Sequence, residues 1–260
     1  MFVSAFKKII LGLFSAFLLF SVVLPGAMAK EKPLRIGVDS PYPPFAYVEN
    51  GVLTGFDVDI AHALCKELAR ECDIQIVEFD RIIPSIVAGE LDLGIAGMGA
   101  TDERKKLVDF TDRYFRSHSI FIEREGENLG LKLEDLKDKK IATQAGTIQE
   151  TYLKKVYGEV SEIMIIPDYE GVFEALKDGS ADLIFVDGLP GYHYLRSHEG
   201  AGLETIGLPV HSDIVIDSSC IAVGKQQPEL REAVNQAIQQ LRRKGEYDRI
   251  NRKYFDFNVY

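Results

Sequence analysis

The chain has 260 residues, of which 30 are basic and 40 acidic, so its formal net charge is −10 at pH 7. This balance argues against a nucleic-acid partner, because such proteins need basic patches that replace the counterions of the phosphates. It is compatible with a cationic ligand. The length suits one large domain or two lobes of about 100 residues each.

The N-terminal segment, residues 1–29, has the features of a cleavable secretory signal. Two lysines precede an apolar run at residues 9–24, and small residues follow at Ala27 and Ala29. The alternative is a membrane anchor, but the run is marginal for a bilayer, which needs about 20 apolar residues. We therefore expect export, cleavage near Ala29 and Lys30, and a mature chain without a membrane span.

Strand and helix patterns alternate along the rest of the chain. In its first half, strands are expected at residues 34–38, 74–79, 91–97 and 119–123, and helices at residues 55–69, 81–90 and 102–109. A charged stretch at residues 123–140 interrupts this rhythm. After it, strands are expected at residues 140–143, 162–166, 181–187 and 220–224, and helices at residues 147–157, 169–179 and 229–245.

Repeated strand–helix units favour parallel sheets with helices on both faces, and two such blocks indicate an α/β protein of two lobes. Ligands of such sheets bind beyond the carboxyl ends of the strands. Four parts of the chain follow strand ends in this way: Asp39, residues 96–104, residues 144–150 and Asp187. They are therefore the candidate ligand-binding segments.

The first expected strand leads into DSPYPPFAY, residues 39–47, which holds three prolines and three aromatic residues. Proline stiffens the chain and removes backbone donors, so this is not an ordinary strand-to-helix turn. In one interpretation the prolines end the strand and the aromatic rings fill a core. In the other, a rigid loop holds Asp39 and Tyr42 at the mouth of a binding site.

Two of the three cysteines, Cys65 and Cys72, are close enough in sequence to form a disulfide in an exported protein. Seven residues along a helix span about 10 Å, beyond the limit of about 7 Å for bridged Cα atoms. If the bridge forms, the helix must therefore end before Cys72. Cys220 is expected to be a buried strand residue.

The segment GMGATDER contains an arginine in an unusual place. Gly97 and Gly99 permit tight turns and close backbone approach, and Asp102 is suited to cap the helix that begins there. Arg104 then lies in the first turn, where the helix dipole disfavours a cation. One explanation is a bidentate clamp on a carboxylate, and the alternative is a solvated surface arginine.

Two further segments combine a helix start with polar groups. Thr147 and Glu150 fit a capping box, and the N–H groups of such a helix start can also bind an anion. Asp187 ends a strand before a helix start expected near Pro190, where it could equally be a turn or capping residue.

Signatures of catalysis and of cofactor or metal binding are missing from the sequence. There is no G-x-S-x-G or H-E-x-x-H motif, and the glycine spacing matches neither a phosphate loop nor a dinucleotide fingerprint. The five histidines and the close cysteine pair have no zinc-ligand spacing. We therefore expect no cofactor and no metal.

Taken together, these segments resemble the family 3 solute-binding proteins of bacterial polar amino-acid ABC importers, and particularly the members that bind lysine/arginine/ornithine, histidine or arginine. The resemblance covers the chain after the signal. It rests on the order and spacing of RIGVDSPYPPF, GFDVDIAHALCKEL, FDRIIPSIVAGELDL, ATDERKKLVDFT, QAGTIQETY, ADLIFVD and KYFDFNVY.

The resemblance implies a periplasmic, monomeric and non-enzymatic protein with the type II periplasmic-binding-protein fold, in which two α/β lobes are joined by two hinge strands and close on a ligand. The first lobe would comprise residues 30–116 and 217–260, and the second residues 117–216. The hinges would lie near residues 116–120 and 209–217. The partners would be an amino acid and an inner-membrane ABC permease complex.

The resemblance also implies roles for single residues. Arg104 would clamp the α-carboxylate of the ligand, and Asp187 would receive its α-ammonium. Thr147, Ile148 and Gln149 would contact the ligand from the helix start of the second lobe.

The side-chain pocket would be formed by Asp39, Tyr42 and Phe79. The expected ligand is a cationic L-amino acid, with arginine preferred over lysine and ornithine. Glutamine or histidine binding is an alternative, and so is a periplasmic cyclohexadienyl dehydratase, an enzyme with the same fold.

The chain departs from the histidine-binding members at two places. Ala96, Gly97 and Gly99 stand where those members carry serines, so these positions offer backbone groups but no hydroxyls. Ile148 replaces a threonine that is common in relatives, which leaves its backbone N–H as the expected contact. Both departures disfavour histidine as the ligand.

Overall fold

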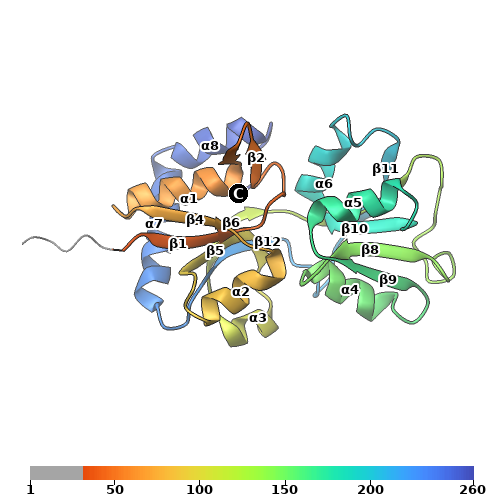
Figure 1. Ribbon diagram of the computed structural model, residues 1–260, viewed down its shortest axis with the longest axis horizontal. Coiled ribbons are helices and arrows are strands. Elements are labelled where there is room, and N and C mark those ends of the chain that lie inside the picture. Colours follow the sequence, from red (N-terminus) through yellow and green to blue (C-terminus); the bar gives the residue numbers. More distant parts are fainter. Residues whose placement is uncertain (1–31) are drawn as a thin grey trace, which may run out of the picture. The chain divides into compact units, whose positions relative to one another are not determined.

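The computed structural model describes residues 32–260, so the expected signal segment and its cleavage point at Ala29 and Lys30 lie outside the described residues. Within residues 32–260, helices and strands alternate as two blocks, each built on a five-stranded sheet (Figure 1). Among residues 32–260, none of the helices has the length and the apolar composition of a membrane span.

The first sheet has the strand order β4-β1-β5-β12-β6. We call the part of the chain around it the first lobe. Its elements are β1 (Leu34–Val38), β2 (Tyr47–Glu49), β3 (Val52–Thr54), α1 (Phe56–Glu67), β4 (Cys72–Ile76), α2 (Phe79–Val87), β5 (Leu93–Gly99), α3 (Asp102–Leu107), β6 (Asp109–Arg116), β12 (Ser218–Val223), α7 (Pro228–Arg243) and α8 (Glu246–Tyr254).

The second sheet has the strand order β11-β7-β10-β8-β9, and the chain around it is the second lobe. Its elements are β7 (Ser119–Arg124), β8 (Lys140–Gln144), α4 (Ile148–Val156), β9 (Glu162–Ile166), α5 (Tyr169–Lys177), β10 (Leu183–Asp187), α6 (Gly188–Leu195) and β11 (Leu203–Val210). In both lobes helices cover both faces of the sheet: α1 and α8 lie opposite α2 and α3, and α5 and α6 lie opposite α4 (Figure 1).

Both sheets are mixed, whereas the sequence pattern favoured parallel ones. β1 pairs in parallel with β4 and β5, but β12 is antiparallel to both of its neighbours. In the second sheet β8 is parallel to β9 and β10, while β7 is antiparallel to β10 and β11. β7 and β12 are the strands through which the chain enters one lobe from the other.

The sequence pattern missed the hairpin of β2 and β3 as well as β6, β11 and α8. The hairpin had a recognisable signal, because its turn is Asn50-Gly51 with positive φ at both residues (52° and 78°). Such a turn joins antiparallel strands through its matching twist. β6 and β11 lacked a clear alternation of apolar residues, and β11 contains a proline.

The chain passes between the two sheets at two places, which we call the first and second crossing segments. The first consists of Ser117 and His118, between β6 and β7, and the second is residues 211–217, between β11 and β12. The N–H of Ser117 donates to the carbonyl of Asp217 at 2.9 Å, so the two crossing segments are bonded to each other.

The proline-rich loop, residues 39–47, contributes both to the core and to the region where a ligand site was predicted. Phe45 is fully buried and stacks on Phe115 with ring centroids 4.8 Å apart, so it belongs to the core of the first lobe. Tyr42 bonds to Ala46 through its N–H at 2.7 Å, which closes the loop. The peptide bonds before Pro41 and Pro44 are cis.

The predicted disulfide between Cys65 and Cys72 is confirmed, with Cα atoms 5.9 Å apart. Helix α1 ends at Glu67, and Ala69 has a left-handed φ of 53°, so the helix does stop before Cys72. Cys72 is the first residue of β4. The remaining cysteine, Cys220, is buried in β12, as expected.

Replacing Cys65 and Cys72 by serine should lower the free energy of unfolding by about 2–3 kcal/mol, the loop-closure value for a ring of this size. Denaturant titration of the oxidised protein and of the double variant gives the difference. The control is Cys220→Ser, which removes a thiol without opening a ring. Equal midpoints for the oxidised protein and the double variant would contradict the prediction.

Candidate functional site

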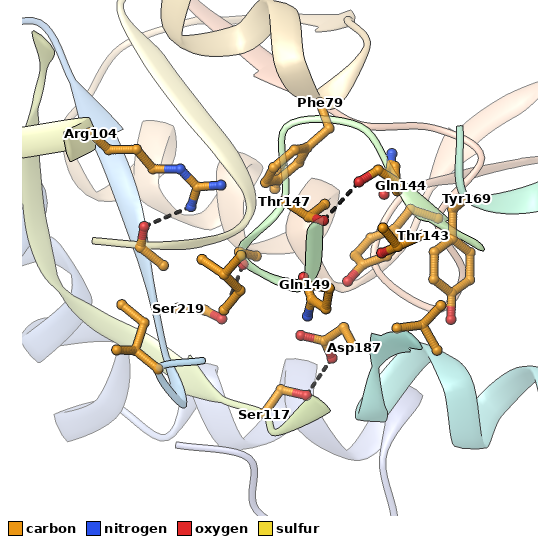
Figure 2. Close-up of a pocket in the computed structure, with 17 residues that line it drawn as sticks. Phe79, Arg104, Ser117, Thr143, Gln144, Thr147, Gln149, Tyr169, Asp187 and Ser219 are labelled. Carbon is orange, nitrogen blue, oxygen red and sulfur yellow. Dashed lines mark hydrogen bonds between the residues drawn. The ribbon is translucent and has the colours of Figure 1, made fainter. Parts of the chain in front are cut away.

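A cavity lies between the two lobes, beyond the carboxyl ends of β1, β5, β8 and β10 (Figure 2). Its empty space is about 550 Å³, counting the solvent at its mouth. It is lined by Tyr42, Phe79, Ala96, Gly97, Gly99, Arg104 and Ser219 from the first lobe, by Thr143, Gln144, Thr147, Ile148, Gln149, Tyr169, Val186 and Asp187 from the second, and by Ser117 and Ile216 from the crossing segments.

All the residues predicted to bind a ligand line this cavity except Asp39. Their roles toward a ligand stay predictions. The arrangement follows from the topology, because β1, β5, β8 and β10 all end at the edge of their sheet that faces the other lobe.

Arg104 lies in the first turn of α3 and reaches across the cavity. Its Nη1 donates to the carbonyl of Gly99 at 2.7 Å and its Nη2 to the carbonyl of Gly146, in the second lobe, at 2.8 Å. Burial lowers the pKa of this guanidinium to about 10, and no acidic side chain among residues 32–260 offsets the effect. A cation held in this way favours an anionic ligand.

The cap of α3 differs from the expected one. Thr101, not Asp102, is the N-cap, and its hydroxyl accepts the N–H of Arg104 at 3.3 Å. Asp102 is the first residue inside the helix and its side chain is exposed. Both residue types cap helices well, and the extended backbone of Thr101 decides between them.

The N-terminus of α4 faces the cavity from the second lobe. Thr147 is its N-cap, as predicted, and accepts the N–H of Glu150 at 3.1 Å. The carboxylate of Glu150 reaches one residue further back than in a capping box, to the N–H of Gly146 at 2.6 Å. The N–H groups of the first helical residues have no acceptor within the helix, so Ile148 and Gln149 offer donors to an anion.

Asp187 lies opposite, at the end of β10, where it is also the N-cap of α6. Its Oδ1 accepts the N–H of Leu189 at 3.2 Å and the hydroxyl proton of Ser117 (Figure 2). The helix therefore begins at Gly188, before the expected start near Pro190. Burial raises the pKa of the Asp187 carboxyl to about 7, against the opposing effect of these hydrogen bonds.

Asp39 is buried beside the cavity and is engaged by the second lobe. Only 5% of its surface is exposed, and its Oδ2 accepts from Nε2 of Gln144 at 2.7 Å. Burial raises its pKa to about 7, and the bond to Gln144 works in the opposite direction. Gln144 thus lies between Asp39 and the cavity, which it lines.

The aromatic residues of the site do not all face open space. The ring of Phe79 lies under Arg104, with the guanidinium carbon 5.3 Å from the ring centre. The rings of Tyr42 and Tyr169 meet across the lobes in a T-shaped pair, with centroids 4.9 Å apart. The hydroxyl of Tyr169 is buried without a hydrogen-bond partner among the described residues.

The glycines allow the first lobe's backbone to line the cavity. Gly97 has a φ of 60°, which disfavours other residues, and its N–H donates to the hydroxyl of Tyr114 at 3.0 Å. At Gly99 a Cβ atom would come within 2.9 Å of the Ile216 side chain, so a larger residue would have to displace this side chain of the second crossing segment.

Several lining residues were not singled out from the sequence: Ser117, Thr143, Gln144, Tyr169, Val186, Ile216 and Ser219. Gln144, the last residue of β8, did belong to the candidate segment 144–150, and Tyr169 follows the end of β9, so the rule of strand ends could have found it as well. Ser117, Ile216 and Ser219 lie at or beside the crossing segments. No local pattern marks such residues.

Comparison with known proteins decides which family this geometry represents. The model of the bacterial extracellular solute-binding proteins, family 3, matches residues 34–257. The chain belongs to this family. It is thus a solute-binding component of transport and not an enzyme.

Curated members of the solute-binding family are similar over nearly their whole length. The L-arginine-binding protein of Pseudomonas aeruginosa is 35% identical over 258 residues, covering 96% of this chain and 98% of that protein. The histidine-binding periplasmic protein of Escherichia coli K12 is 30% identical, covering 98% of this chain and 99% of that protein.

A solved structure of an ancestral arginine-binding protein bound to arginine has a TM-score of 0.81 and 35% sequence identity. It covers 87% of this chain and 99% of the ancestral one. The two-lobed α/β fold predicted from the sequence is therefore confirmed for this solute-binding protein.

Proposed function

We propose that this solute-binding protein captures a free L-amino acid with a cationic side chain in the periplasm and delivers it to an inner-membrane ABC permease, with arginine bound more tightly than lysine and ornithine. One observation carries the proposal: a guanidinium without an acidic partner and a buried carboxyl line the same cavity from different lobes, with a second acid beside them. The names of the arginine-, histidine- and lysine/arginine/ornithine-binding relatives support it.

The α-carboxylate and α-ammonium of the ligand account for two of the three charged groups of the site, Arg104 and Asp187. Its α-carboxylate pairs with Arg104 and accepts from the free N–H groups at the start of α4. Its α-ammonium pairs with the open oxygen of Asp187. These contacts use groups from both lobes, so a ligand stabilises the closed arrangement.

The third charged group, Asp39, selects among ligands by their side chains. A cationic side chain displaces the amide of Gln144 and pairs with Asp39, whereas an apolar side chain would leave that acid without a counter-charge. A planar guanidinium stacked on the ring face of Tyr42 or of Phe79 would gain about 0.5–2 kcal/mol for each cation–π contact. Arginine can also form forked hydrogen bonds, which lysine cannot.

Glutamine is a second candidate ligand, and one contact favours it. The amide of Gln144 donates to Asp39 at 2.7 Å, so a primary amide fits against this carboxyl. A glutamine ligand would present the same group from the cavity. It would leave the charge of Asp39 unmatched, which is why we rank it below arginine.

Calorimetric titration with the twenty amino acids, ornithine and citrulline tests the proposal. We expect arginine to bind most tightly, followed by lysine and ornithine, with citrulline much weaker because it keeps the shape of arginine without its charge. Tighter binding of glutamine or of an acidic amino acid than of arginine and lysine would overturn the assignment.

We also propose that the ligand drives closure of the lobes about the two crossing segments, near residues 116–120 and 209–217. Because the ligand contacts both lobes, it should bind the closed form selectively and raise the melting temperature with its concentration. Small-angle scattering should show a smaller radius of gyration with arginine than without it. An unchanged radius at saturating arginine would contradict closure.

The affinity for arginine should depend on pH below neutrality. Burial between the lobes raises the pKa values of the Asp39 and Asp187 carboxyls to about 7, and each must be ionised to pair with a cation of the ligand. Protons are therefore released on binding, and the affinity should fall as the pH drops below 7. The limit is about tenfold per pH unit for each carboxyl.

Titrations from pH 8 to pH 5 check this dependence. Glutamine serves as the control ligand, because it has a cation only at its α-ammonium and should show the dependence of a single carboxyl. An arginine affinity that stays constant or rises on acidification would show that neither carboxyl takes up a ligand cation.

A further inference from the structure

Ser117 joins the cavity to both crossing segments. Its N–H donates to the carbonyl of Asp217 in the second crossing segment at 2.9 Å. The carbonyl of the following residue, His118, accepts the N–H of Gly188, the first residue of α6, at 2.5 Å. The backbone at Ser117 is therefore held by the second crossing segment on one side and by the second lobe on the other.

The side chain of Ser117 is directed at the carboxyl of Asp187 (Figure 2). Its hydroxyl donates to Oδ1, and the hydroxyl oxygen accepts the N–H of Leu189 at 3.2 Å. The same N–H also lies 3.2 Å from Oδ1 of Asp187. These contacts occupy one carboxylate oxygen, and the described residues provide no hydrogen bond to the other, Oδ2.

We propose that Ser117 is a positioning residue that fixes the carboxylate of Asp187 so that Oδ2 receives the α-ammonium of the ligand. The inference rests on the proposed function, and it extends that function to a residue of the first crossing segment. It also gives the ammonium contact a direct link to the segment about which the lobes would close. Ser117 is 7% exposed, so its hydroxyl is shielded from bulk solvent.

The pH dependence of binding tests this role, because it would not change if Ser117 only supported the fold. The hydroxyl bond favours the ionised carboxylate and opposes the effect of burial on the pKa of Asp187. Without the hydroxyl, the pKa of the buried Asp187 carboxyl should rise further, and the pH at which affinity is lost should rise with it.

The other ionisable groups around Asp187 allow its titration to be recognised. Tyr42 and Asp57 from the first lobe and Tyr169 from α5 interact electrostatically with Asp187. His118 from the first crossing segment lies against Gly188 and the hydroxyl of Tyr192, and His193 follows on α6. Arg104 lines the same cavity, and Asp39 lies beside it. Burial lowers the pKa values of His118 and His193 and raises those of Tyr42 and Tyr169, so these four stay neutral near pH 7. Asp57 has a pKa raised to about 7 by burial but does not line the cavity.

The experiment compares Ser117→Ala with Ser219→Ala. Both serines line the cavity, but the hydroxyl of Ser219 donates to the carbonyl of Gly97, at 3.3 Å, and not to Asp187. Affinity is measured by calorimetry between pH 5 and pH 9, with whichever amino acid the wild-type protein binds most tightly. The step due to Asp187 is the part of the profile that Asp187→Asn removes.

For Ser117→Ala we expect the affinity at pH 8 to fall about tenfold, because the lost hydrogen bond is one to a charged group. We also expect the midpoint of the Asp187 step to move to higher pH. Ser117→Thr should restore both values because it keeps the hydroxyl. Ser117→Cys, with a weak donor of similar size, should behave like alanine and serves if the alanine variant does not fold. Ser219→Ala should leave the midpoint in place.

An unchanged midpoint together with an affinity within twofold of wild type in Ser117→Ala or Ser117→Cys would overturn the inference. The outcome for Asp187→Asn separates this failure from that of the proposed function. If Asp187→Asn itself keeps the wild-type affinity and pH profile, the ammonium contact is wrong. If it loses both while the Ser117 variants do not change, only the role of Ser117 is wrong.

Discussion

Replacing Arg104 by glutamine should weaken the binding of every α-amino acid by at least about 100-fold, the order found when one partner of a buried ion pair is lost. The ligand carboxylate would lose its only cation while the N–H groups of α4 remained. The ligand-free protein should be at least as stable as wild type, because the variant removes a cation that is buried without an acidic partner. A site residue whose loss spares stability is typical of a preformed binding site.

Calorimetry and thermal denaturation without ligand measure the two parts of this result. The matched control is Arg81→Gln, which removes an arginine from the exposed side of α2 in the same lobe and should change neither quantity. Binding by Arg104→Gln within a few-fold of wild type would show that the carboxylate contact lies elsewhere.

The second large effect is expected for Asp39→Asn, which should lower the affinity for arginine and lysine by about 100-fold or more. Asparagine keeps an oxygen that can accept from an amide, but it removes the charge that pairs with a guanidinium or ammonium. Glutamine binding should therefore change by less than about tenfold. The variant should invert the preference between a cationic and an amide side chain.

Parallel titrations with arginine, lysine and glutamine give the ratio of the affinity for a cationic amino acid to the affinity for glutamine. Asp57→Asn is the control, because Asp57 is likewise buried, in the same lobe, with a pKa raised to about 7, but it does not line the cavity. It should leave the ratio of arginine to glutamine affinity unchanged. Equal losses for all three ligands in Asp39→Asn would assign Asp39 to stability and not to selectivity.

The features that the sequence determined by itself are those that depend on close neighbours in the chain. Thr147 was recognisable as a helix cap because the N–H that it accepts belongs to Glu150, three residues later. The end of α1 before Cys72 followed from the rise of a helix and the reach of a disulfide. Arg104 drew attention because a cation in the first turn of a helix opposes the helix dipole.

Local pattern was insufficient where two neighbouring residues could play the same part or where a partner comes from far along the chain. Thr101 and Asp102 are both good caps, and only the backbone geometry selects Thr101. The direction of β12 was not readable from its composition, because a buried strand has the same pattern in parallel and antiparallel pairing.

Asp39 shows most clearly what only the tertiary structure decided. Its place at the end of β1 predicted a position near the ligand site, but its partner, Gln144, is 105 residues away and belongs to the other lobe. The same holds for Ser117 and Asp187, 70 residues apart. Burial, pKa and hydrogen-bond partner at such residues depend on how the two lobes meet, and that contact is made by side chains that no local periodicity brings together.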